Sequence, residues 1–432
     1  MPIFSKSSEE QKVPSKALII ICLIIAGELI FGLPYHVLRY FRPTMLDVFN
    51  VTNTNIGDAF AIYGILAMIS YFPSGVIADH FSARKLMSIS LFTTALGGIY
   101  FATIPGQLGL SILFGYWGIT NILLFWSAMI RATREWGGKL AQGRAFGILD
   151  GGRGLMAAGA ATIAVFLLAA ILPADLENVS NIQRTQAIKS VIYFYTLLTF
   201  GTAVLVWFFI PDSKIDNSKS TSNPFSGITR VLRNRLAWLQ AIIVICAYCG
   251  YRGLDFFTLY GIDVLGMNEV SAARFMSYST YLRPVAAIGA GFLADRFTTK
   301  KIIGGTFTLL LLSYLILVFL PPSPNVLNII TVNLLFTFIA VYALRGVYFA
   351  LFEETNISGN LTGTTVGLIS VIGFTPDIFF NSIVGRILDS SPGIAGYNHF
   401  NMFLCFFAAM GMMATYALAK RSKKIISAIQ DN

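Results

Sequence analysis

The feature that most constrains this fold is a series of apolar runs that recurs along almost the whole chain. Each run is long enough to cross the hydrocarbon core of a bilayer, which takes roughly 20 helical residues. The breaks between runs are short, so the chain leaves no room for a soluble catalytic domain. We place twelve transmembrane helices at 17–41, 55–78, 86–104, 108–131, 143–172, 190–210, 236–262, 270–294, 301–320, 326–350, 363–388 and 399–419.

The charges follow the pattern of a membrane protein. The formal net charge is +10, but when alternate loops are assigned to the two faces, most lysines and arginines fall on one face. This asymmetry is the positive-inside rule, and it predicts that both termini are cytoplasmic and that the protein lies in the cell (inner) membrane. We therefore expect the lipid bilayer as its surroundings, no nucleic-acid partner, and function as a monomer.

A polar stretch divides the chain near its middle. Residues 211–235 are rich in serine, asparagine and lysine, which is typical of a linker. We predict an N-terminal six-helix bundle at 1–210, a cytoplasmic linker at 211–235 and a C-terminal six-helix bundle at 236–432. The fold class that follows is all-α and integral to the membrane.

An internal repeat supports this division. A glycine, an aspartate four residues later and a following basic pair occur twice, at a spacing of 216 residues, which is half the chain. Such self-similarity indicates two related halves. The repeated residues are Gly75, Asp79, Arg84 and Lys85 in the first half and Gly291, Asp295, Lys300 and Lys301 in the second.

This repeated loop resembles the signature of the major facilitator superfamily. The resemblance covers nearly the whole chain and implies two pseudo-symmetric six-helix bundles with a central site near the membrane midplane. It also implies that the two aspartates and four basic residues form a network that latches one of two access states, which makes them gating residues. We expect the two motif glycines to allow close helix packing. His80 departs from the arginine usual in this motif.

Several ionisable residues lie inside the predicted spans. Each costs at least roughly 2.5 kcal/mol to insert, so each is a candidate functional residue that must face a cavity or a partner. They are Glu28, Arg39, Asp58, Arg153, Arg252, Asp255, Arg283, Arg345 and Asp377.

Two of these arginines occupy near-equivalent places in the two halves. Arg39 and Arg252 lie in stretches that resemble the phosphate-binding segments of the organophosphate:phosphate antiporters, with Asp255 following the second. Facing each other, the two guanidiniums would clamp an anion, because each offers paired donors to phosphate or carboxylate oxygens. Two alternatives stay open: Arg39 extends to the outer headgroups, or Arg252 forms a buried ion pair with Asp255.

Other candidate site residues surround this clamp. Arg153 stands where those antiporters carry a histidine, although Asp150, nearly one turn away, would neutralise it. Tyr35 and Tyr251 are candidate hydrogen-bonding partners of the substrate. Glu28, near the middle of the first helix, is the main proton-coupling candidate, and Asp255 is a weaker one.

The sequence thus predicts a secondary transporter, not an enzyme, that moves a small organic anion, a phosphate ester or carboxylate, by alternating access, as an exchanger without a cofactor. No motif for ATP hydrolysis is found in it. One alternative is a proton-coupled symporter or exporter of amino acids, nucleosides or siderophore-like solutes that uses Glu28. A membrane enzyme or receptor is the other, and the sequence offers no metal-ligand cluster or nucleophile constellation for it.

Overall fold

The computed structural model describes residues 15–138, 142–172, 179–212, 233–348, 350–351 and 362–430, and all regular structure in these ranges is helical. The first half comprises α1 (Lys16–Leu29), the π-helix η1 (Gly32–His36), α2 (Val37–Phe49), α3 (Asn53–His80), α4 (Ala83–Phe101), α5 (Gln107–Thr120), the π-helix η2 (Asn121–Trp126), α6 (Ser127–Gly137), α7 (Gln142–Ile171) and α8 (Asn181–Phe209).

The second half follows the same plan. It comprises α10 (Arg235–Gly253), the 3₁₀-helix η4 (Leu254–Phe256), α11 (Phe257–Asp263), α12 (Glu269–Thr280), α13 (Leu282–Phe297), α14 (Thr299–Phe319), α15 (Leu327–Val347), α16 (Thr362–Gly373), α17 (Pro376–Ser390) and α18 (Ile394–Gln430). Most of the predicted linker, 213–232, lies outside the described residues, so its boundaries stay a prediction.

Local sequence explains where these helices begin and end. Thr52 and Asn55 form a reciprocal capping box at the start of α3, and Ser180 and Gln183 form another at the start of α8. Each box satisfies backbone N–H groups that have no partner within the helix. α2 ends at Phe49 and is followed by Asn50, whose left-handed backbone, with φ of 50°, reverses the chain toward α3.

The exterior of the protein suits a lipid solvent. Large apolar side chains such as Phe72, Phe166 and Phe292 are more than half exposed on the long helices. By length and hydropathy, nine helices in the described ranges could cross a membrane, and ten if the bent pair formed by α1 and η1–α2 is one span. All twelve predicted ranges overlap helices, but the count of twelve stays a prediction because not every range meets this criterion.

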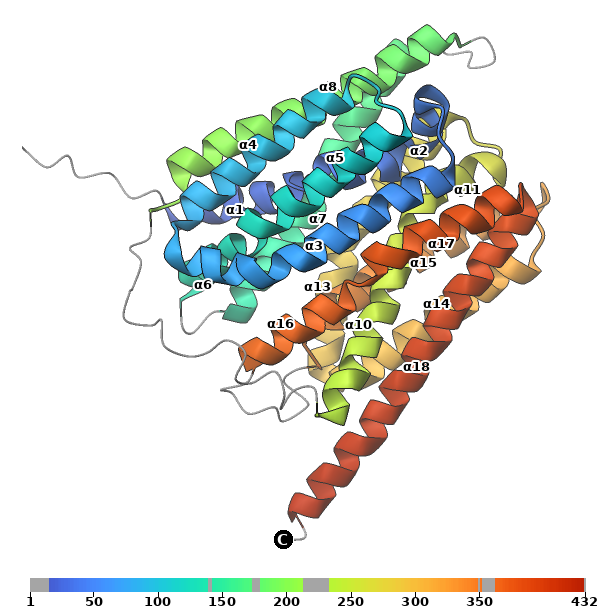
Figure 1. Cartoon of the computed structure of the whole chain (residues 1–432). Coiled ribbons are helices and arrows are strands. Elements are labelled where there is room, and N and C mark those ends of the chain that lie inside the picture. The colour runs from blue at the N-terminus through green and yellow to red at the C-terminus, as the bar shows by residue number, and fades with distance from the viewer. Residues whose placement is uncertain are drawn as a thin grey trace, which may run out of the picture.

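The two halves meet along α3 and α17, which lie side by side in Figure 1. Gly57, Gly64 and Gly385 lie so close to the opposite helix that an added methyl group would overlap its backbone. Small residues of this kind let membrane helices approach closely. Next to Gly57, the carboxylate of Asp58 also pairs with Arg386 of α17, at 2.7 Å.

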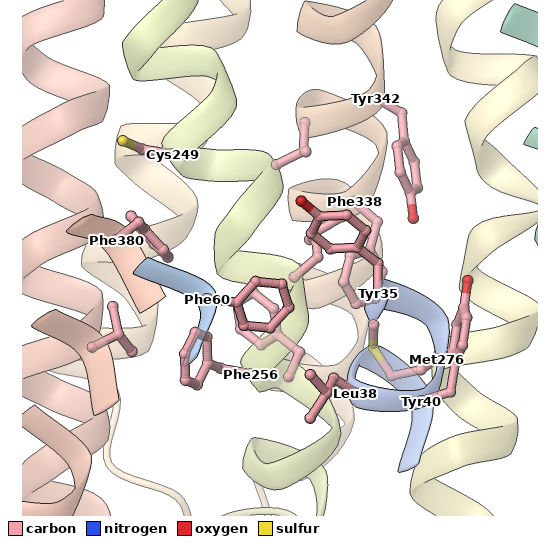
Figure 2. Close-up of a cluster of buried hydrophobic side chains, with 14 of the residues drawn as sticks. Tyr35, Leu38, Tyr40, Phe60, Cys249, Phe256, Met276, Phe338, Tyr342 and Phe380 are labelled. Carbon is pink, nitrogen blue, oxygen red and sulfur yellow. The ribbon is translucent and has the colours of Figure 1, made fainter. Parts of the chain in front are cut away.

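Figure 1 shows the bundles lying against each other near α2 and α11 and diverging toward α6 and the start of α10. On the side where the bundles lie against each other, which we call the closed side, the buried core extends from one half into the other. In Figure 2, rings from the first half meet rings from the second. They include Tyr35, Tyr40 and Phe60 on one side and Phe256, Phe338, Tyr342 and Phe380 on the other.

Candidate functional site

A break in the first span begins the site. α1 and the η1–α2 segment meet at a bend of 45°. Pro34 lies in the intervening π-helix and has no backbone N–H to donate, which accounts for the irregular turn. Wide turns of this type are frequent at functional sites. Here the turn carries Tyr35 and His36, both buried, into the protein interior.

A cavity lies beside this turn, between the two halves. It has about 750 Å³ of unfilled space, counted with its opening. Arg39 and Arg153 line it from the first half, and Arg252 and Arg345 line it from the second. Aromatic rings make up much of the remaining wall. They are Phe31, Tyr35, Tyr63, Tyr71, Trp126, Tyr248, Tyr251 and Phe374.

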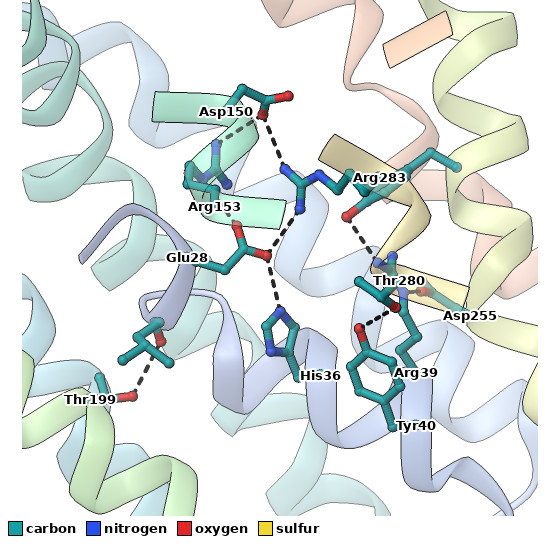
Figure 3. Close-up of polar contacts among 12 residues, drawn as sticks. Glu28, His36, Arg39, Tyr40, Asp150, Arg153, Thr199, Asp255, Thr280 and Arg283 are labelled. Carbon is teal, nitrogen blue, oxygen red and sulfur yellow. Dashed lines mark hydrogen bonds and ion pairs between the residues drawn. The ribbon is translucent and has the colours of Figure 1, made fainter. Parts of the chain in front are cut away.

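Glu28 is the centre of the first polar cluster, which Figure 3 shows. Its carboxylate lies 3.0 Å from Arg153 Nε, 3.3 Å from Arg283 Nη1 and 3.2 Å from His36 Nε2. Arg283 also donates to Asp150, at 3.1 Å, and comes from α13 in the second half. This cluster therefore links the halves by ion pairs.

Asp255 is the centre of the second cluster. It lies in η4, where the seventh span changes from α10 to α11, and accepts from Arg39 Nε at 2.6 Å and from Arg252 Nη1 at 3.1 Å. Arg252 also lies 2.5 Å from Asp377, and Tyr251 accepts a hydrogen bond of 2.9 Å from Arg39. The two arginines predicted as a clamp are thus joined through one carboxylate.

α2 forms further bonds to the second half. Thr258 donates to the backbone carbonyl of Arg39 at 2.5 Å, and the hydroxyls of Tyr40 and Thr280 lie 3.0 Å apart. Nearer the closed end, Thr44 donates to a carboxylate of α12 at 2.6 Å. Polar bonds to the opposite half therefore follow α2 along most of its length.

These contacts decide between the alternatives for the clamp arginines. Arg39 is 4% exposed, so the expectation that it extends to the outer headgroups is wrong. The ion pair expected between Arg252 and Asp255 is present. Arg153 pairs mainly with Glu28, since its distance to Asp150 is 3.9 Å. Whether any of these residues binds substrate stays a prediction.

Arg345 lines the cavity but was predicted only as an ionisable residue inside a span, without a role in binding. Its guanidinium carbon lies 4.2 Å from the centre of the Tyr251 ring, and its Nε has no hydrogen-bond partner. No carboxylate among the described residues forms an ion pair with it. Arg283 and Asp377 were likewise not among the predicted substrate-binding residues. All three stand out in the sequence as ionisable residues inside apolar spans, which is the signal that could have identified them.

The motif residues lie at the divergent end and do not form the expected network. Arg84 pairs with Asp212 at 2.6 Å, not with a motif aspartate, because Asp212 follows α8, which packs beside α4. Lys300 donates to Ser422 at 2.8 Å. Asp79 and Asp295 are exposed, with no ion pair within the described part of the chain, and Lys85 and Lys301 are exposed too.

The motif glycines need a similar correction. A methyl group added at Gly75 or Gly291 would meet no described atom within 4 Å, so neither glycine allows close helix packing in this conformation. The bundles have separated at this end, which removes the neighbours that the motif predicted. The role of the six charged motif residues in gating stays a prediction.

A lipid-exposed helical exterior around a polar cavity shared by two halves defines a membrane transport protein, not an enzyme. No group of side chains suited to hold a metal ion is found within the described ranges. The model of the Major Facilitator Superfamily matches residues 24–375, and the chain belongs to this family. The predicted membership is confirmed, whereas the organophosphate:phosphate branch is not.

Known proteins add context. The chain is 31% identical to the inner membrane protein YqcE of Escherichia coli (strain K12), over 90% of this chain and 91% of that protein. It is 26% identical to a probable nitrate/nitrite antiporter, NarK1, of Thermus thermophilus, over 56% of this chain and 53% of that one. A crystal structure of a D-xylose-proton symporter superposes with a TM-score of 0.74 at 15% identity, covering 94% of this chain and 97% of that one. Together with the many helices long enough to span a bilayer, these relatives support an integral inner membrane protein.

Proposed function

We propose that this chain is a secondary transporter that moves a small organic anion across the inner membrane by alternating access, as an exchanger. One observation carries the proposal: arginines from both halves line the cavity between them, and among the residues that the structure describes the guanidiniums there outnumber the carboxylates. A buried excess of positive charge favours a negatively charged ligand. The similarity to a probable nitrate/nitrite antiporter agrees with an anionic cargo.

Exchange follows from the same charge balance. When the empty cavity closes, water leaves and the surplus cation loses its solvation, which costs several kcal/mol by rough estimate. A bound anion compensates that charge, so the loaded protein closes and reorients more readily than the empty one. Each anion that leaves is then replaced by another before the protein returns.

The paired state of the clamp arginines bears on the choice of anion. A phosphate monoester carries about −1.5 to −2 charges at pH 7. To bind it between Arg39 and Arg252, Asp255 and Asp377 would have to release both guanidiniums. A monocarboxylate carries one negative charge, which the guanidinium of Arg345, outside these ion pairs, can compensate. We therefore favour carboxylate substrates over the phosphate esters that the resemblance to the organophosphate:phosphate antiporters implies.

A second candidate function is proton-coupled symport or export of an uncharged or zwitterionic solute. The buried contact of 3.2 Å between Glu28 and His36 favours it, because two titratable groups in contact can pass a proton. The fold is shared with a D-xylose-proton symporter. In this function the arginines serve only to pair with carboxylates inside the protein.

Counterflow in proteoliposomes separates the two candidates. Vesicles loaded with an unlabelled anion, such as gluconate or inorganic phosphate, are diluted into its labelled form with and without a pH gradient. Uptake that requires the internal anion and ignores the pH gradient supports the exchanger. Uptake of a labelled sugar or amino acid that follows the pH gradient without an internal anion contradicts it.

A further inference from the structure

The arginines that line the cavity differ in their partners. Arg39 pairs with Asp255, Arg153 with Glu28, and Arg252 with Asp255 and Asp377. Arg345 also lines the cavity but forms no ion pair with any carboxylate that the structure describes. Its guanidinium lies against the ring of Tyr251. A guanidinium in this position has donors left for a ligand.

Charge counting gives the same result for the whole site. Four arginines and four carboxylates form the linked clusters and balance one another when each carboxylate is ionised. They are Arg39, Arg153, Arg252, Arg283, Glu28, Asp150, Asp255 and Asp377. His36 also lies 3.2 Å from Glu28, and it adds a charge to this count only when its ring is protonated. Among the described residues, and with His36 neutral, Arg345 therefore leaves the cavity with one uncompensated positive charge.

We propose that Arg345 binds the anionic group of the substrate and that this substrate carries a single negative charge. The inference rests on the function proposed above and names its substrate class. A singly charged anion makes the occupied cavity neutral. A doubly charged anion leaves a negative charge in a site that loses its water, and a neutral solute leaves the positive charge in place.

The rest of the substrate faces aromatic walls. Trp126 of the first half and Phe374 of the second lie with their ring centres 6.5 Å apart at the cavity, and Tyr35 lies on another side. Rings suit a body with apolar C–H faces, and the tyrosine hydroxyl can bond to a polar substituent. The geometry points to a monocarboxylate, or another monoanion, attached to a body of this kind.

Tyr251 connects the proposed anchor to the contact between the halves. Its ring centre lies 4.2 Å from the guanidinium carbon of Arg345 and 4.4 Å from that of Arg39. Arg39 in turn forms the ion pair with Asp255 that crosses between the halves. An anion that binds Arg345 therefore acts one side chain away from this ion pair, where binding can bias the equilibrium between access states.

Binding to the purified full-length protein tests the proposal. Three probes share one carbon skeleton and differ in charge: glucose is neutral, gluconate carries one negative charge and glucarate carries two. Benzoate and inorganic phosphate extend the set to an aromatic monoanion and to a multiply charged ion. Affinity is measured by stabilisation against heat in detergent and by competition for counterflow.

Three variants accompany the wild type. Arg345→Gln removes the charge, and Arg345→Lys keeps it without the guanidinium fork. Arg42→Gln is the matched control. Arg42 is buried, its guanidinium carbon lies 4.1 Å from the centre of the Phe256 ring, and it forms no ion pair within the described chain. Unlike Arg345, it does not line the cavity. The thermal transition of each unliganded variant reports whether it is folded.

We expect a singly charged probe to bind the wild type and Arg42→Gln alike, to lose at least about tenfold in affinity in Arg345→Gln, and to recover part of it in Arg345→Lys. Preference for a doubly charged probe, or unchanged affinity in Arg345→Gln, overturns this inference and leaves the anion exchanger standing. If no anion of either charge binds the wild type, the proposed function itself fails, and the inference fails with it.

Discussion

Replacing Asp255 with asparagine tests how strongly the buried ion pairs hold the two halves together. The Asp255 carboxylate is 2% exposed and serves two arginines, at 2.6 and 3.1 Å. Removing one partner of a buried ion pair typically costs about 3–5 kcal/mol, because a charge is left without compensation. In this variant Arg252 keeps Asp377 and Arg39 keeps the hydroxyl of Tyr251. We therefore expect the lower end of that range, about 3 kcal/mol of unfolding free energy.

The matched control is Asp58→Asn. Asp58 also pairs across the halves, with Arg386, but the two side chains are 39% and 56% exposed. Water and salt screen such a pair, so its loss costs below about 1 kcal/mol. The same chemical change at the two positions thus separates the effect of burial from the effect of losing a carboxylate.

Denaturation with sodium dodecyl sulfate in mixed micelles measures both variants. The buried thiols of Cys22, Cys246 and Cys249 become accessible to a fluorescent thiol reagent when the bundles unfold. Equal destabilisation of the two variants would refute the reasoning that burial governs the strength of these pairs. The double variant Arg39→Gln with Asp255→Asn supplies a second check, since its cost falls below the sum of the single variants if the pair is coupled.

Three further predictions concern the clamp, the closed end and the motif. Arg39→Lys and Arg252→Lys each reduce anion counterflow by at least about tenfold while the folded protein is still extracted, because lysine lacks the fork with which each guanidinium holds two partners beside the cavity. Near-normal rates in both variants would remove the two arginines from the site. Gly64→Val abolishes counterflow because its side chain overlaps the backbone of α17, whereas Gly75→Val, which meets open space, keeps the melting temperature of the wild type. Asp79→Asn leaves the melting temperature unchanged, because the side chain is exposed in this conformation. The same variant alters the transport rate if the motif latches the other access state. A fall in melting temperature would contradict the observed exposure.

The helical fold could be predicted because lipid makes each span a long apolar run. The halves could be predicted because Asp79 and Asp295 repeat at a fixed spacing. Sequence alone also places Glu28, Arg39 and Arg252 inside the membrane, where a charge needs a partner. These inferences depend on local composition, which a single sequence displays in full.

The partners themselves could not be predicted. Arg39 lies 216 positions from Asp255, and Glu28 lies 255 positions from Arg283, so only the packed structure brings them together. Arg345 could not be singled out either. It differs from the other arginines of the cavity because it forms no ion pair with a described carboxylate, and only the packed structure shows this. Arg84 was assigned to the motif network because the sequence gives no sign that Asp212 comes nearer.

The hydrogen bonds and ion pair of α2 bear on which half of the protein this helix moves with. In sequence α2 is part of the first half, but a π-helical turn separates it from α1, and Arg39, Tyr40 and Thr44 all bond to the second half. If these bonds persist while the bundles rock, α2 travels with α11 and α12, and the hinge of the first span lies at residues 32–36. The mechanical division of the protein then falls inside a transmembrane helix, not in the linker that divides the chain.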